Sequence, residues 1–237
     1  MSTRTRTAII TGASRGLGLA LAVELANRDY RLIIDARGGA ELAAATKELS
    51  ALTSVIALPG DVTDDWHRHA LVDAAEDRVD LLVNNASQLG PSPQPELARY
   101  PLAKLQSVYA TNVLAPLALV QLTLPLIPAG GAIINVTSDA AVEPYEGWGG
   151  YGSSKAALDQ LTAILAAEQP DLRVYAVDPG DMRTRMHQEA FPGEDISDRP
   201  PPRDSVPGLL ELIDGELPSG RYQARAILVG AGAGSAS

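Results

Sequence analysis

The sequence predicts an α/β fold: one domain over residues 1–237, with a doubly wound parallel sheet of about seven strands and helices on both faces. Two observations predict it. Short β-branched apolar runs alternate with segments of helical composition through the first third of the chain, and the first run is followed at once by a glycine-rich turn. With 237 residues, 46% of them apolar, the chain can form one substantial core.

The first strand is expected at Arg6–Thr11, the glycine-rich turn at Gly12–Gly18 and a helix at Leu19–Arg28. This order suits a phosphate-binding loop, because N–H groups at the helix start point at an anion and glycines let it approach. The glycines follow Thr-Gly-x-x-x-Gly-x-Gly rather than Gly-x-Gly-x-x-Gly. We interpret the turn as a nucleotide site; the alternative is a tight turn that only packs a helix on a sheet.

The remaining segments continue the alternation. Further strands are expected at 31–37, 54–60, 80–87, 132–137, 172–178 and 226–229, and helices at 41–50, across Asn112 with a kink or break at Pro116, from Lys155, and over 206–217. The segment 185–217 is interpreted as a substrate loop, with its proline-rich part 193–207 either a lid or a plain solvent loop. The glycine-rich end, 230–237, is expected to be a flexible tail.

Composition argues against several function classes. A net charge of −10 disfavours nucleic-acid binding, and the absence of cysteine removes disulfides and thiolate chemistry. No apolar run approaches the roughly 18 residues of a membrane span, so a cytoplasmic protein with no membrane partner is expected. His67, His69 and His187 have no accompanying ligand cluster, so no metal site is expected.

Tyr151 and Lys155 are the strongest candidates for chemistry. Four residues apart on a predicted helix, they share a face, and Ser138 leaves the preceding strand toward the same point. Tyrosine has a pKa of about 10; an ammonium roughly 4 Å away favours the phenolate by about 4 kcal/mol, and desolvation opposes this. We therefore expect a net fall in the tyrosine pKa, with the Ser138 hydroxyl donating to a carbonyl oxygen. Alone, Tyr-x-x-x-Lys more often marks an ordinary helix start.

Taken together, the motifs resemble the short-chain dehydrogenase/reductase family over nearly the whole chain. They are Thr11–Gly18, Asp61-Val62, Asn84-Asn-Ala-Ser87, Asn112, Ser138, Tyr151–Lys155 and Pro179–Thr184, in the family's order. Ser87 stands where the family usually has glycine. The run from Gly147 to Arg173 is also locally similar to the sepiapterin-reductase branch.

The resemblance implies a Rossmann-type fold and a role for each matching residue. Tyr151 would exchange a proton with the substrate, Lys155 would lower its pKa and hold the nicotinamide ribose, Ser138 would orient the carbonyl, and Asn112 would anchor a water in a proton relay. The implied cofactor-binding residues are Gly12, Ser14, Arg15, Gly16, Leu17, Gly18, Arg37, Asp61, Val62, Asn84, Ala86, Tyr151, Lys155, Pro179, Gly180, Met182 and Thr184.

The cofactor is expected to be NADP rather than NAD. Family members that use NAD would carry an acid at the position of Ala36, and here Arg37 and Arg15 offer guanidinium groups to a 2′-phosphate. Asp35 complicates this, but one residue earlier on a strand its side chain should face the other way unless a bulge intervenes.

The function expected is therefore reversible reduction of a ketone or aldehyde by NADPH through Ser138, Tyr151, Lys155 and Asn112. Two alternatives remain open: a non-catalytic redox-sensing regulator on the same scaffold, and an NAD-dependent alcohol dehydrogenase or epimerase. The partner is a small-molecule carbonyl or alcohol, and the resemblance implies a homodimer or homotetramer. Candidate pocket residues are Gln88, Glu143, Tyr145, Trp148, Met182 and Met186.

Overall fold

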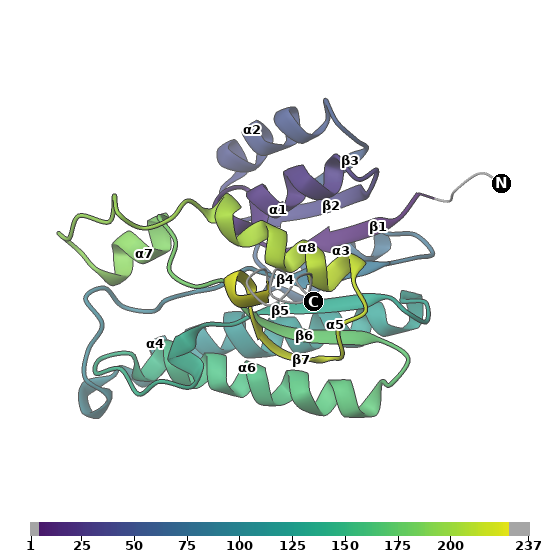
Figure 1. Cartoon of the computed structure of the whole chain (residues 1–237). Helices are drawn as coiled ribbons and strands as arrows, with labels where there is room; N and C mark the ends of the chain where they lie inside the picture. The colour runs from purple at the N-terminus through teal and green to yellow at the C-terminus, as the bar shows by residue number, and fades with distance from the viewer. Residues whose placement is uncertain (1–4, 228–237) are drawn as a thin grey trace, which may run out of the picture.

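The computed structural model describes residues 5–227, so the predicted tail at 230–237 lies outside the described residues. Seven strands form one parallel sheet in the order β3-β2-β1-β4-β5-β6-β7 (Figure 1). The strands are β1 (Thr7–Ile10), β2 (Arg31–Ala36), β3 (Val55–Pro59), β4 (Leu81–Asn84), β5 (Ala132–Val136), β6 (Arg173–Asp178) and β7 (Gly220–Gln223). The predicted fold class is confirmed.

Helices cover both faces of the sheet. They are α1 (Gly16–Ala26), α2 (Gly39–Leu49), α3 (Asp65–Asp73), α4 (Leu102–Tyr109), α5 (Ala115–Thr123), α6 (Gly149–Glu168), α7 (Arg185–Ala190) and α8 (Val206–Asp214). Successive strand side chains alternate between faces, so Ile10 packs with α1, α2 and α8 while Ile9 packs with α3, α5 and α6. Burial on both sides explains why the inner strands are mainly apolar on both faces.

The last strand lies earlier than predicted. The apolar run at 226–229 suggested a strand, but Gly220–Gln223 pairs with β6 and residues 224–227 are helical, while 228 and 229 lie outside the described residues. As an edge strand β7 needs only alternate burial, and its four residues alternate between half-buried and exposed. Apolar content alone was therefore a poor guide at the sheet edge.

The helix across Asn112 changes its winding instead of ending. A π-helical turn, Ala110–Leu114, joins α4 to α5, and Pro116 sits in the first turn of α5, where its missing N–H costs little. The combined helix Leu102–Leu126 is the one described helix long and apolar enough to cross a membrane. Its Leu119 and Val120 pack in the core.

The carboxyl ends of the strands carry the functional edge of the sheet. α7 and the loops around it extend beyond this edge, opposite α4 (Figure 1). The strand order reverses between β1 and β4, which is the position where open α/β sheets bind ligands. α8, by contrast, belongs to the core against α1. The predicted helix at 206–217 therefore ends at Asp214 and is not part of a free loop.

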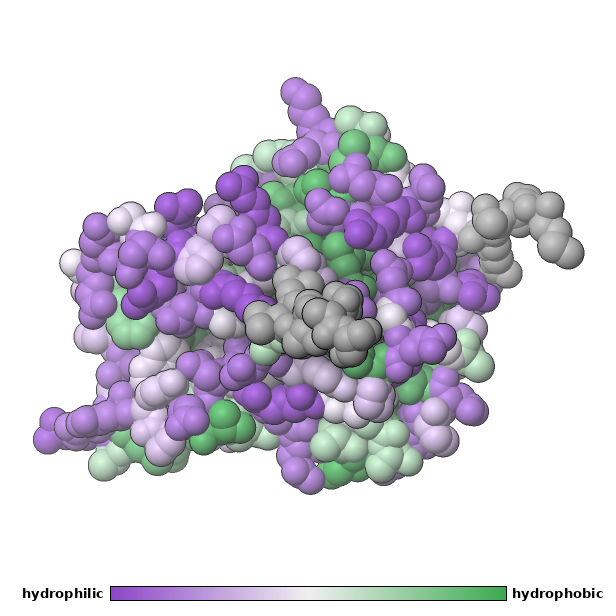
Figure 2. Space-filling view, in the orientation of Figure 1, coloured by the Kyte–Doolittle hydropathy of each residue, from purple (hydrophilic) through white to green (hydrophobic). Residues whose placement is uncertain are grey.

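The face of the molecule in Figure 2 is mainly hydrophilic, with hydrophobic residues in separate small groups.

Candidate active site

The glycine-rich turn has the shape required for a close ligand approach. Gly12 and Gly16 adopt positive φ angles of 66° and 61°, and a Cβ on Gly12 would lie 2.9 Å from the Ala86 Cα. Gly18 does not border the cleft; it lets α1 pack against Asn85, as expected for a third glycine of such a loop. The N–H groups at the start of α1, from Gly16 onward, fit a pyrophosphate, whereas the Gly12 N–H donates to Asp35.

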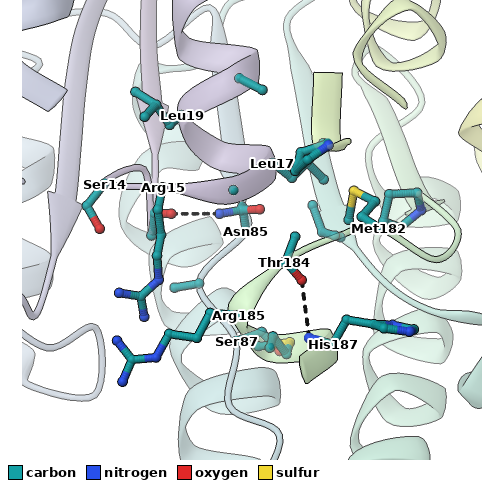
Figure 3. Close-up of a pocket in the computed structure, with 18 of the residues that line it drawn as sticks. Ser14, Arg15, Leu17, Leu19, Asn85, Ser87, Met182, Thr184, Arg185 and His187 are labelled. Atoms are coloured by element: carbon teal, nitrogen blue, oxygen red, sulfur yellow. Dashed lines mark hydrogen bonds between the residues drawn. The ribbon is translucent and has the colours of Figure 1, made fainter. Parts of the chain in front are cut away.

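Of the paired asparagines, the second supports the loop. Asn85 Nδ2 donates to the carbonyls of Thr11 and Gly12 at 2.8 and 3.0 Å (Figure 3). Asn84, predicted to contact the cofactor, is buried within the sheet and donates to Asn135 Oδ1 at 2.8 Å. The prediction for Asn84 is therefore corrected: as the last residue of β4, it braces β5 and does not border the cleft.

A cleft of about 1910 Å³ runs along this edge of the sheet. Pockets for single small ligands measure about 300–1,000 Å³, so it has room for a dinucleotide and a substrate. The predicted residues that line it are Gly12, Ser14, Arg15, Gly16, Leu17, Arg37, Asp61, Val62, Ala86, Gln88, Ser138, Trp148, Tyr151, Lys155, Pro179, Gly180, Met182, Thr184 and Met186.

Cations gather at one end of the cleft. Arg15 forms an ion pair with Glu41, and Arg185 of α7 lies 4.0 Å from the same carboxylate. Figure 3 shows the two guanidinium groups near each other. Arg37 is two-thirds exposed and lies 4.0 Å from Asp61. Arg185 was not predicted; its place directly after Thr184 was the available indication.

Tyr151 and Lys155 lie together at the other end. Both are on α6 and nearly inaccessible, with exposed fractions of 8% and 2%. The Lys155 Nζ donates to the Val136 carbonyl at 2.7 Å and lies 5.6 Å from the Tyr151 ring centre. The predicted shared face is confirmed by this geometry.

Burial dominates the acidity of both groups. It raises the pKa of Tyr151 to about 12, although hydrogen bonds with Ser87 and Ser138 lower it; Asp178 and Asp139 raise it further. Burial lowers the pKa of Lys155 to about 8, and Asp159 opposes that shift. The expected net fall in the tyrosine pKa is therefore wrong, because desolvation outweighs the hydrogen bonds with Ser87 and Ser138 that lower it.

Ser138 has an acidic neighbour that was not predicted to act here. Its hydroxyl donates to Asp139 Oδ1 at 2.8 Å, and Tyr145 donates to the other oxygen at 2.9 Å. Tyr145 packs on Trp148 and bonds to Asp139, but neither it nor the exposed Glu143 lines the cleft itself. Their predicted place in the pocket is corrected.

Asn112 is a brace between α6 and the Ser87-Gln88 loop. Its Nδ2 donates to the Gln88 carbonyl at 2.9 Å and to Ser154 at 3.0 Å, and its Oδ1 accepts from the Gln88 N–H at 2.8 Å and from Ser87 at 3.2 Å. The side chain is fully buried and its polar atoms have protein partners. The predicted water anchor stays a prediction.

Aromatic side chains form a wall beside Tyr151. Trp148 packs edge-on against Tyr151 and Tyr145, with ring centres 5.8 and 6.2 Å away, and contacts Phe191 at 5.7 Å. Met186 packs beside them. Phe191 directly follows α7, so the end of that helix packs against Trp148.

The three histidines have separate surroundings, and residues 5–227 contain no group of three or more His, Asp or Glu side chains that could hold a metal ion. His67 is buried against Asp35, His69 is exposed beside Asp65, and His187 accepts from Arg199 at 3.3 Å.

Comparison with known proteins agrees with this architecture. Residues 6–195 match the family model described as short chain dehydrogenase. The chain is 34% identical over 215 residues to a benzil reductase ((S)-benzoin forming) of Saccharomyces cerevisiae, covering 86% of this chain and 79% of the relative. It is 33% identical to sepiapterin reductase of Mus musculus, covering 77% and 76%.

A solved short chain dehydrogenase from Escherichia coli CFT073 in complex with NADPH superimposes with a TM-score of 0.81 at 27% identity, covering 93% of this chain and 96% of that one. The family match, the two relatives and the shared fold agree with the resemblance inferred from the motifs. The chain therefore belongs to the short-chain dehydrogenase family and is an oxidoreductase acting between CH–OH and C=O groups.

Proposed function

We propose that the chain is an NADPH-dependent reductase of ketones or aldehydes, with an aromatic or other bulky apolar group beside the carbonyl. One observation carries the proposal: a single cleft joins a glycine loop flanked by Arg15 and Arg37 to the buried pair Tyr151 and Lys155. When bound, NADPH supplies the hydride. Gly12 and Gly16 would cradle its pyrophosphate, and Pro179, Gly180 and Thr184 would hold the nicotinamide end.

Tyr151 then acts as the acid. Its pKa of about 12 keeps the phenol protonated at neutral pH, so it carries the proton that a developing alkoxide needs. Lys155 is protonated below pH of about 8, and its charge favours the phenolate left after transfer. Ser138 orients the carbonyl after its hydroxyl turns from Asp139 toward the substrate oxygen.

Trp148 and Met186, which line the cleft beside Tyr151, support the substrate class, and Phe191 packs on Trp148. Flat apolar groups gain most from burial against such a surface. The named relatives reduce benzil and sepiapterin, which both place a carbonyl next to a ring system or a conjugated group, and this agrees with the proposed preference.

The test is NADPH oxidation by purified protein with aromatic diketones, aryl ketones, a pteridine ketone and short aliphatic aldehydes. Aromatic diketones and aryl ketones are expected to give kcat/KM at least about tenfold above the aliphatic aldehydes. Tight NADPH binding without turnover of any carbonyl would favour the non-catalytic regulator, and a clear NADH preference would favour the NAD-dependent alternative. The homodimer or homotetramer also stays a prediction, which light scattering after size exclusion tests.

A further inference from the structure

Asp35 at the end of β2 has both carboxylate oxygens occupied beneath the glycine loop. Its Oδ1 accepts from the Gly12 N–H at 2.6 Å, and its Oδ2 lies 3.0 Å from His67 Nε2. Asp35 is 1% exposed and the His67 side chain 8%. Oδ1 therefore supports the glycine loop, and Oδ2 is held by His67, a residue of α3.

The position of this carboxylate matters for cofactor choice. In dinucleotide-binding folds, an acid about 20 residues after the glycine motif binds the ribose 2′-hydroxyl of NAD, whereas a nearby arginine accommodates the 2′-phosphate of NADP. Asp35 lies 23 positions after Gly12, and Arg37 follows two residues later; both border the cleft. The same strand end thus holds both groups, and a carboxylate turned to the ribose would repel a phosphate.

Strand alternation places the Asp35 side chain on the face of the sheet opposite to that of Ala36. β2 and β3 stay in register through Asp35–Leu58 and Ala36–Pro59, so no bulge reverses this orientation. Two charged atoms of a carboxylate seldom remain buried without partners. His67 supplies the second partner, and its ring is fixed because it packs on Gly60, where any Cβ would overlap it.

We propose that His67 is a positioning residue for cofactor selectivity: it holds Asp35 under the glycine loop, away from the adenosine ribose, and leaves Arg37 to meet a 2′-phosphate. This inference rests on the proposed use of NADPH. Sequence spacing could not reveal it, because His67 and Asp35 are 32 positions apart.

The test is the ratio of the dissociation constants for NAD⁺ and NADP⁺, measured by calorimetry without substrate. In His67→Leu, the released carboxylate is expected to tighten NAD⁺ binding and weaken NADP⁺ binding, so the ratio falls at least about tenfold. His67→Gln keeps an N–H donor and should retain the ratio within about twofold. His69→Leu, on the exposed side of the same helix, is the matched control and should change neither constant.

Adding Asp35→Asn to His67→Leu removes the charge and should restore most of the selectivity. If His67→Leu weakens the binding of NAD⁺ and NADP⁺ equally, or leaves the ratio of their dissociation constants unchanged, His67 is only structural and the inference is wrong.

If His67→Leu does not fold, the single variant Asp35→Asn tests the inference instead. Its amide can keep both contacts, so neither dissociation constant should change more than about twofold. A tenfold loss of NAD⁺ affinity in Asp35→Asn would mean that the carboxylate already reaches the ribose, which overturns the inference. The wild-type ratio tests the NADPH proposal separately.

Discussion

The two ends of the cleft use charge in opposite ways. At the catalytic end, Tyr151 and Lys155 are almost completely buried, and desolvation moves their pKa values to about 12 and about 8. At the adenosine end, the side chains of Arg15, Arg37 and Glu41 are about half exposed or more, so water and salt screen them. Burial shifts the acidity of both groups at one end, and exposed charges screened by solvent line the other.

Removing the phenol should give the largest effect at the catalytic end. Tyr151→Phe keeps the buried ring and its contact with Trp148 but removes the proton donor. We expect kcat to fall by about 10³, with the NADPH dissociation constant changed less than twofold. Steady-state kinetics and calorimetry measure the two quantities. Normal turnover by this variant would refute the assignment of Tyr151 as the acid.

Lys155→Met should lower kcat/KM by about 10² while stabilising the fold. Because burial holds the pKa of Lys155 near 8 instead of 10.5, the folded state binds its proton less well than the unfolded state. This cost is fully present below pH 8 and disappears as the pH rises to about 10.5. We expect the free energy of unfolding to rise by about 1–2 kcal/mol at pH 7, less than the full shift because Val136 loses a donor.

Denaturant titrations at pH 7 and pH 10 check this prediction. The stability difference between wild type and Lys155→Met should shrink at the higher pH, and wild-type kcat/KM should decline as the pH passes about 8. Equal stability differences at both pH values would show that burial of the ammonium is not the cause.

Arg37→Ala tests the other end of the cleft. Loss of one exposed guanidinium should raise KM for NADPH about tenfold, leave KM for NADH within twofold, and leave kcat unchanged. The effect should weaken at high salt, unlike that of Tyr151→Phe. A parallel change for both cofactors would contradict a contact specific to the 2′-phosphate.

Glu41→Gln should give the smallest change. The carboxylate pairs with Arg15 and lies near Arg185, so it competes with a bound phosphate for both cations. We expect NADPH to bind about threefold more tightly in this variant, since exposed ion pairs contribute only fractions of a kcal/mol. Weaker binding would indicate instead that Glu41 orients Arg15 for the ligand. Titrations at two salt concentrations distinguish these outcomes.

Local sequence patterns were sufficient to predict most strands and helices and the order of the motifs. The β-branched strands, the glycine turn and the Tyr151–Lys155 spacing are each specified within a few residues, and the structure has them in the predicted order. Prediction failed where a distant partner decides: β7 forms at Gly220–Gln223 because β6 offers it hydrogen bonds, and Asn84 faces Asn135 rather than the cleft. Tyr145 likewise turns to Asp139.

The sequence by itself therefore determined the fold class, the family and which residue types stand at the strand ends. Only the tertiary structure decided their electrostatics. Whether Tyr151 becomes more or less acidic depends on how much water its neighbours exclude, and Asp35 is held beneath the loop by the Gly12 N–H and by His67 from another helix. Desolvation and long-range pairing arise from the packed chain as a whole, so no short stretch of sequence contains them.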